Sequence, residues 1–263
     1  MTTILDKILT EKKIEVEKLK NQTVNQTAVE HKHHSFISIL KNATELSIIA
    51  EFKRASPSKG DINIGLSPAE QTSAYIQYGA SAVSVLTDKA FFKGSIDDLE
   101  DVRKTIDAPI LNKDFIIDTT QIDLAKVAGA DIILLIVAAM DEQKLISLYQ
   151  YAIDKGLEVL IEVHNEAELE IALKTGGQLI GVNNRDLKTF AVDLSVTERL
   201  APTVKKSGAF LISESGIKTL DDVKRVVAAG ANGILVGETF MRADSLAQTL
   251  QQMKLPLKKE TPL

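Results

Sequence analysis

The chain has 263 residues, with 31 Lys and Arg against 36 Asp and Glu, and therefore a formal net charge of −5 at pH 7. An acidic chain argues against non-specific binding to nucleic acid or to an anionic membrane, because both need an electropositive face. No cysteine is present, which excludes disulfides, thiolate metal sites and cysteine nucleophiles. The longest apolar run, residues 132–140, has nine residues, whereas a membrane span needs about 20. The first residues lack the apolar core of a signal peptide, so we expect a cytoplasmic protein.

The expected organisation is a single domain over residues 1–263 with three parts. Apolar residues at helical spacing predict an amphipathic helix over 4–20, inside a helical extension that spans 1–45. The alternating pattern described next occupies 46–253. The last stretch, KLPLKKETPL (254–263), is typical of a mobile tail.

Short β-rich apolar runs alternate with helical patterns along the chain. The runs are SIIAEF (47–52), AVSVL (82–86), PILNK (109–113), IILLIV (132–137), EVLIEV (158–163), LIGV (179–182), FLIS (210–213) and GILVG (233–237). Successive runs start roughly 27 residues apart, which is the size of one strand–helix unit with a right-handed crossover. Eight such units predict an α/β protein, a (β/α)8 TIM barrel. A doubly wound open sheet is the alternative, although such sheets have fewer strands.

Several helices between these runs carry start signals. Residues 67–70 and 195–198 both have the pattern of a capping box, with a serine followed three positions later by a glutamate. Asp141 and Thr219 are suited to be N-caps.

Charged and polar residues stand at the carboxyl ends of five predicted strands. They are Glu51 and Lys53, Lys113, Glu162, Asn183 and Arg185, and Ser213 and Ser215. Side chains two residues apart on a strand point to the same face, and in a barrel these strand ends share the rim where active sites are built. A single charge at a strand end is often only solvated. Five strands that end this way favour a site, because burying unpaired charges is costly.

The last two units carry a second signal, since Gly216 and Gly237 follow their strands directly. Barrels frequently bind phosphate on the backbone N–H groups of these two loops. The alternative is that both glycines serve only a tight turn. Glu238 would repel a phosphate, so it must point away or be held off by Lys53.

Six motifs in sequence order resemble the indole-3-glycerol phosphate synthase family of tryptophan biosynthesis. They are IAEFKRASPSKG (49–60), LNKDF (111–115), IEVH (161–164), GVNNRDL (181–187), SESGI (213–217) and GILVGE (233–238). The resemblance implies a carboxy-lyase that converts 1-(o-carboxyphenylamino)-1-deoxyribulose 5-phosphate to indole-3-glycerol phosphate and releases CO₂ and water. It implies no cofactor and no metal.

The resemblance also implies residue roles. Lys113 would be the general acid on the C2′ carbonyl, and Lys53 would lie near the substrate carboxylate and assist the dehydration. Glu162 would be a general base or stabilise the cationic intermediate, and Glu51 would position the lysines. Substrate would be oriented by Asn183, Arg185 and Ser215, and phosphate would be held by Ser56, Gly216 and Gly237.

The chemistry suits these residue types. Protonation of a carbonyl at neutral pH calls for a lysine whose pKa is lowered by a second lysine or by burial. The anthranilate ring needs an apolar wall, for which the candidates at or just beyond strand ends are Leu86, Phe92, Phe115, Leu134 and Leu187. Each is equally compatible with an ordinary core position. Asp88 and Phe92 belong to a loop that could cover the substrate.

The histidines offer further candidates. His31, His33 and His34 could bind a metal, but no acid lies beside them at ligand spacing, so a solvated loop is favoured. His164 is either a partner of Glu162 or a polar residue at a strand exit, and we favour the strand exit.

Two other functions compete with a synthase. A sugar-phosphate isomerase barrel would use a Cys/Asp or Asp/Asp pair, which the absence of cysteine and the paired lysines disfavour. A catalytically inactive barrel is disfavoured because Lys53, Lys113 and Glu162 are all present. The expected partner is therefore a small molecule, the anthranilate-ribulose phosphate, and not nucleic acid or membrane. We expect a monomer, since a barrel completes its own core.

Overall fold

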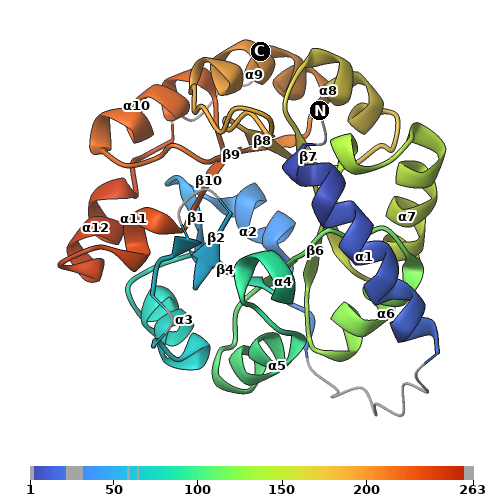
Figure 1. The fold of residues 1–263 in the computed structure, drawn as a ribbon. Helices are drawn as coiled ribbons and strands as arrows, with labels where there is room; N and C mark the ends of the chain where they lie inside the picture. Colours follow the sequence, from blue (N-terminus) through green and yellow to red (C-terminus); the bar gives the residue numbers. More distant parts are fainter. Residues whose placement is uncertain (1–2, 22–31, 58–59, 64, 258–263) are drawn as a thin grey trace.

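Eight parallel strands close into a barrel in the computed structural model, which describes residues 3–21, 32–57, 60–63 and 65–257 (Figure 1). The strands are β1 (Ser47–Phe52), β4 (Ala82–Leu86), β5 (Ile110–Lys113), β6 (Ile132–Ile136), β7 (Glu158–Val163), β8 (Leu179–Asn183), β9 (Phe210–Glu214) and β10 (Gly233–Val236). Each strand pairs with its neighbours in the chain, and β1 pairs with β10 to close the ring. The closed barrel confirms the predicted class and excludes the doubly wound sheet.

A layer of helices surrounds the strands. It contains α3 (Pro68–Gln77), α5 (Ile96–Thr105), α6 (Thr119–Val127), α7 (Glu142–Asp154), α8 (Glu166–Leu173), α9 (Ser195–Ser207), α10 (Leu220–Ala229) and α12 (Leu246–Met253). Every predicted strand boundary lies within one residue of the observed one. Shorter elements decorate the loops: the hairpin β2 (Ala55–Ser56) and β3 (Gly60–Asp61), α4 (Lys89–Phe92), the 3₁₀ turn Val137–Ala139 and α11 (Glu238–Met241).

The predicted helix starts are mostly confirmed. Asp141 and Thr219 are N-caps, and Ser67 accepts a hydrogen bond from the Glu70 amide. The capping box predicted at Ser195 is wrong. That residue lies inside α9, and its amide and hydroxyl both donate to Asp193, because a carboxylate two residues earlier is the stronger acceptor.

The core forms two layers because strand side chains alternate. One set packs outward against the helices. The other fills the barrel with Ile49, Ala82, Leu111, Ile132, Leu134, Ile136, Leu160, Leu179, Ile212 and Leu235. Below this filling, the fully buried ring of Phe36 closes the amino-terminal end of the barrel, which we call the base. Phe36 opens the short helix α2 (Phe36–Asn42), where only an apolar segment was predicted.

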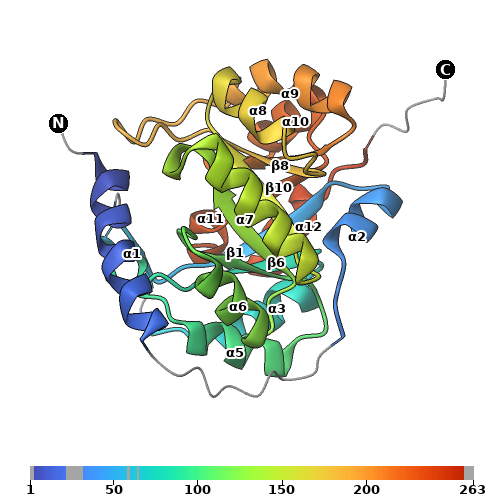
Figure 2. The same cartoon turned by 90° about the vertical axis from the view of Figure 1, so that its right-hand side faces the viewer.

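The predicted amphipathic helix is α1 (Ile4–Lys20), and it lies at the other end of the barrel, which we call the mouth (Figure 2). Its charged face is not fully solvated. Lys12 is 1% exposed and pairs with Asp114 at 2.7 Å and with Asp88 at 3.2 Å. These two acids follow β5 and β4, so one buried lysine ties the extension to two loops at the mouth.

The predicted tail is partly ordered. The Leu46 amide donates to the Leu255 carbonyl at 2.7 Å, and the Leu257 amide donates to the Thr44 carbonyl at 2.9 Å. The expectation of mobility is therefore wrong for residues 254–257, which pair with the chain just before β1. Residues 258–263, and most of the polar loop predicted before α2, lie outside the described residues. Within the described ranges, no helix is long and apolar enough to cross a membrane.

Candidate active site

A cavity of about 690 Å³ opens at the mouth, between the carboxyl ends of the strands and α1. All fifteen residues predicted for the site line it: Glu51, Lys53, Ser56, Leu86, Phe92, Lys113, Phe115, Leu134, Glu162, Asn183, Arg185, Leu187, Ser215, Gly216 and Gly237. Ile4, Leu5 and Ile8 of α1 complete the wall. The extension thus forms part of the cavity.

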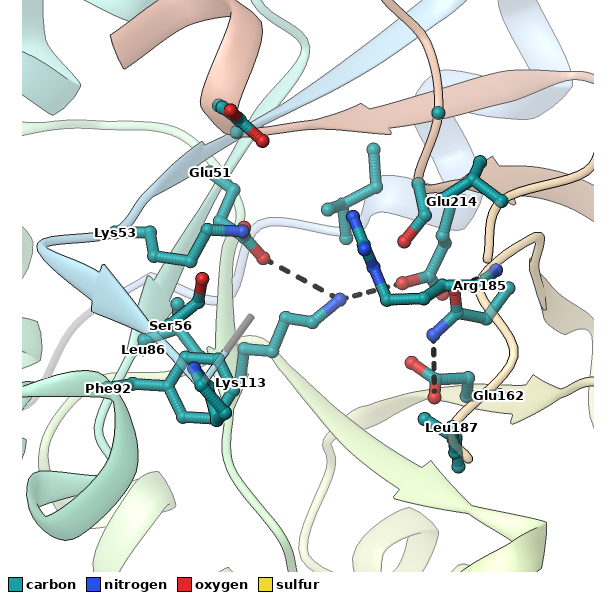
Figure 3. A pocket seen from close by; sticks show the side chains of 18 of the residues that line it. Glu51, Lys53, Ser56, Leu86, Phe92, Lys113, Glu162, Arg185, Leu187 and Glu214 are labelled. Carbon is teal, nitrogen blue, oxygen red and sulfur yellow. Dashed lines mark hydrogen bonds and ion pairs between the residues drawn. The ribbon is translucent and has the colours of Figure 1, made fainter. Parts of the chain in front are cut away.

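Lysines and glutamates converge on this cavity from four strands, β1, β5, β7 and β9 (Figure 3). Lys113 Nζ on β5 lies 2.7 Å from Glu214 Oε2 on β9 and 3.6 Å from Glu51 Oε2 on β1. Lys53 directly follows the end of β1, and its Nζ lies 2.5 Å from Glu51 Oε1. Glu51 therefore contacts both lysines.

Burial and charge act against each other in this network. Burial favours the neutral amine, but the carboxylates of Glu214, Glu51 and Glu162 raise the pKa of Lys113 above its usual value. Burial likewise opposes the ionisation of Glu51, yet Lys53 and Lys113 hold its pKa below the usual value. The expectation that the pKa of Lys113 is lowered is therefore wrong: three acids around it outweigh desolvation and a second lysine.

Glu214 is a site residue that the sequence reasoning missed. Burial, together with the nearby acids Glu162 and Glu51, raises its pKa to about 7 against the opposing charge of Lys113. A carboxyl group with this pKa can both give and take a proton near neutral pH. Ser213, predicted to face the mouth, instead bonds Thr197 and Asn184 on the helix side of the strand.

Two glycines make room for the buried glutamates. A Cβ added at Gly181 would lie 2.1 Å from Glu214 Oε1, and one at Gly237 would lie 2.5 Å from Glu51 Oε1. Neither position has a positive φ. At Gly237 the structure therefore supplies a steric reason for glycine besides the predicted approach of phosphate.

Glu162 on β7 has two polar neighbours, and both contact the same oxygen. Asn183 Nδ2 donates to Glu162 Oε1 at 3.1 Å, and His164 Nε2 lies 3.3 Å from it. The preference for His164 as a mere strand-exit residue is wrong, because its ring faces back toward Glu162 from two positions along the same strand face. Burial opposes ionisation, but His164, Lys113 and Asn183 lower the pKa of Glu162 to about 2.

The loop after β9 turns sharply at the predicted phosphate site. Ser215 and Gly216 have φ of 64° and 84°, and Asn184 Nδ2 donates to the Ser215 carbonyl at 3.2 Å. A Cβ at Gly216 would lie 2.4 Å from Val192 Cγ1, so glycine suits both the turn and the packing. Glu238, in the next loop, was predicted either to point away or to be held off by Lys53; it pairs with Arg242 at 3.5 Å.

The five residues predicted for an apolar wall all line the cavity, with Leu86 and Phe92 across from Leu187 (Figure 3). The rings of Phe92 and Phe115 lie 5.9 Å apart, and Leu86, Leu134 and Leu187 line the same cavity. Arg185, predicted to orient substrate, lines it too and donates from Nη1 to the Phe190 carbonyl at 3.2 Å.

Asp88 and Phe92 belong to the loop predicted to cover the substrate, and of the two only Phe92 lines the cavity. Asp88 is buried, caps α4 and pairs with Lys12, so it holds the loop from which Phe92 reaches the cavity.

His33 and His34 lie away from this cavity. His34 contacts Asp107 through Nε2 at 2.7 Å, and His33 lies 3.4 Å from Asp131, both near the amino-terminal ends of strands. His31 lies outside the described residues. Among the residues that are described, no group of three His, Asp or Glu is suited to hold a metal ion.

Comparisons with known proteins agree with this geometry. The family model described as indole-3-glycerol phosphate synthase matches residues 5–253. The chain is 51% identical to indole-3-glycerol phosphate synthase of Bacillus mycoides over 97% of this chain and 99% of the relative. It is 49% identical to the synthase of Oceanobacillus iheyensis over 97% and 98%. A solved thiamine phosphate pyrophosphorylase of Pyrococcus furiosus shares the fold alone, with a TM-score of 0.59, 18% identity and coverage of 79% of this chain and 93% of that one. The chain belongs to the indole-3-glycerol phosphate synthase family.

Proposed function

We propose that the chain converts 1-(o-carboxyphenylamino)-1-deoxyribulose 5-phosphate to indole-3-glycerol phosphate with the residues of this cavity. The observation that carries these assignments is the convergence of Lys53, Lys113, Glu51, Glu162 and Glu214 beside an apolar wall. A doubly anionic substrate with one aromatic ring needs cations, N–H donors and an apolar surface in one cavity.

The substrate binds between the charged residues and the apolar residues that line the cavity. Its phosphate lies at the loops that carry Ser56, Gly216 and Gly237, and its carboxylate lies near Lys53. The anthranilate ring packs against the apolar side chains around Phe92 and Phe115. This orientation directs the C2′ carbonyl toward Lys113.

Ring closure begins with a proton transfer from Lys113. The ring carbon that bears the carboxylate attacks C2′ while the Lys113 ammonium protonates the C2′ oxygen, which gives a cyclised iminium ion. Because its pKa is raised, Lys113 is fully protonated at neutral pH and available as the acid. Glu214, 2.7 Å away and with a pKa near 7, then returns a proton to the amine.

Decarboxylation and dehydration follow on the same face. The carboxylate leaves as CO₂, and its electron pair neutralises the iminium and restores the aromatic ring, so no cofactor is required for this step. Lys53 then protonates the C2′ hydroxyl, which leaves as water, while Glu162 takes a proton from C1′. The net reaction consumes one proton and yields indole-3-glycerol phosphate, CO₂ and water.

The test is direct because the chain has no tryptophan, so indole fluorescence reports only product. Purified protein is incubated with the substrate in a chelator and without added cofactor. We expect a rising indole signal with an equal amount of CO₂. Substrate that binds without turnover would indicate an inactive barrel, and no binding would indicate another phosphate-binding barrel.

We also infer that the enzyme works as a monomer in the cytoplasm, without nucleic acid or membrane. The closed core and the net charge of −5 support this. Light scattering of the purified chain should give 28.7 kDa, and twice that mass would contradict it.

A further inference from the structure

His164 lies between two carboxylates at the edge of the cavity. Its Nε2 is 3.3 Å from Glu162 Oε1, and its Nδ1 is 2.9 Å from Glu168 Oε2. Only 11% of its side chain is exposed. The ring therefore bridges a residue of the cavity wall and a residue of the outer helix α8.

Two carboxylates beside the ring nitrogens favour a charged ring. A neutral imidazole has one N–H, so one of its nitrogens would direct a lone pair at a carboxylate oxygen. An imidazolium donates from Nδ1 to Glu168 and places the positive charge of Nε2 3.3 Å from Glu162 Oε1, as an ion pair without hydrogen-bond geometry. Although burial favours the neutral ring, Glu162 and Glu168 raise the pKa of His164 to about 10.

The outer carboxylate is fixed in place. Glu168 lies in the first turn of α8 and accepts hydrogen bonds from the His164 amide and from Asn165 Nδ2, both at 2.8 Å. Asn165 caps the same helix. The capped first turn of α8 therefore holds Glu168, and Glu168 holds the His164 ring on the side away from Glu162.

The inner carboxylate faces several other groups. Asn183 on β8 donates to Glu162 Oε1, Lys113 on β5 attracts it, and Glu214 on β9 repels it. Among these, His164 is the cation in direct contact. Because it and Asn183 contact the same oxygen, they fix the orientation of the carboxylate.

We propose that His164 is a positioning residue of this site: as an imidazolium clamped by Glu168, it keeps Glu162 ionised and oriented toward the substrate. This inference rests on the proposed function, in which Glu162 takes a proton during dehydration. It adds the pair His164 and Glu168 to the machinery, although Glu168 does not line the cavity.

Two variants and one control test the proposal. In His164→Gln the cation is lost, and kcat should fall about 10-fold, a modest effect for a residue that acts through another, while KM changes by less than about threefold. In Glu168→Gln the ring loses one of its two acids, so its pKa should drop by at least about one unit. The matched control is His34→Gln, whose ring also pairs with an aspartate but lies at the base, and which should leave kcat unchanged.

Protonation of the ring is measured independently of activity. Nitrogen NMR of the four histidines, with the His164 signal assigned by its loss in His164→Gln, should show a charged ring at pH 8. In Glu168→Gln, kcat should decline on the alkaline side at the same pH at which NMR shows the ring losing its proton. That decline should be absent in His164→Gln.

The proposal would be overturned by a neutral ring in the wild-type protein at pH 8. It would also be overturned if His164→Gln kept its kcat within about twofold, or if kcat in Glu168→Gln did not follow the ring titration. These outcomes differ from a failure of the proposed function, which would appear as a wild-type chain that forms no indole product although the NMR titration behaves as expected.

Discussion

The two ends of the barrel both bury acids but neutralise them differently. At the base, Asp131 is fully buried and accepts hydrogen bonds from Arg103 at 2.9 Å and from the amides of Ile110 and His34 at 3.0 and 2.8 Å. Glu158 accepts from the amide of Phe36 and from the amide that follows it. Backbone donors of this kind cannot reorient without unfolding.

At the mouth, the partners are side chains. Glu51 contacts two lysines, Glu214 contacts Lys113, and Glu162 contacts an asparagine and a histidine. Long side chains can exchange these contacts for the anions of a substrate. A buried charge alone therefore does not identify a functional site. A buried charge whose partners are side chains that can move does.

The largest expected effect is a loss of kcat from a substitution at the mouth. Lys113→Ala should lower kcat by at least about 100-fold, the usual order for loss of a general acid. The indole assay measures it, and circular dichroism checks that the variant is folded. Lys155→Ala, which removes an exposed lysine on the outer surface, is the control. A variant with near-full kcat would remove Lys113 from the role of acid.

The next effect concerns the base, where a substitution should lower stability and leave kcat unchanged. Arg103→Met removes the buried guanidinium that bonds Asp131 and three carbonyl groups, which should cost about 3–5 kcal/mol in the free energy of unfolding. Urea denaturation measures the loss, and kcat of the folded fraction should not change. Lys104→Met, beside it but exposed, should cost less than about 0.5 kcal/mol. A large loss of kcat with unchanged stability would contradict the assignment of a structural role to the base.

A third substitution connects the extension to the mouth. Lys12→Met leaves Asp88 and Asp114 without their shared cation, which should loosen α1 and the loop that carries Phe92. We expect KM to rise about 10-fold, or about 1.4 kcal/mol in binding, with a smaller change in kcat. Lys20→Met, at the exposed end of the same helix, is the control. Equal kinetics for the two variants would show that α1 needs no buried anchor.

The smallest expected effect is the pH dependence that His164 gives to the free energy of unfolding. The pKa of His164 rises from 6.5 to about 10 on folding, so its stabilisation is fully present below pH 6.5 and is lost as pH rises toward 10. The difference in unfolding free energy between wild type and His164→Gln should therefore shrink by about 1 kcal/mol or more between pH 7 and pH 10. Chemical denaturation at both pH values measures it. A difference that stays constant would mean that the ring does not carry the charge.

The sequence predicted the barrel well because each strand is a short apolar run, and spacing alone located all eight. Elements of two to four residues, such as the hairpin β2–β3 and α4, have too few residues for a periodic pattern and were missed. Lys12 looked like part of a solvated helix face, since the acids that bury it come from distant loops.

The site was predictable where side chains follow the strand alternation. Glu214 could have been found by counting two residues on from Ile212, which points into the barrel; reading that strand as ending at Ser213 hid it. The pKa of Lys113 could not be predicted, because it depends on which acids of three other strands lie beside it.

The glycines beside the buried glutamates constrain how the chain can change. At Gly181 and Gly237 any side chain would occupy the space that Glu214 and Glu51 fill. Each glycine therefore constrains its glutamate, because a larger residue fits only if the carboxylate moves away from the lysine that it contacts. An alanine at either position would have to revert to glycine before the glutamate could take up its present position again.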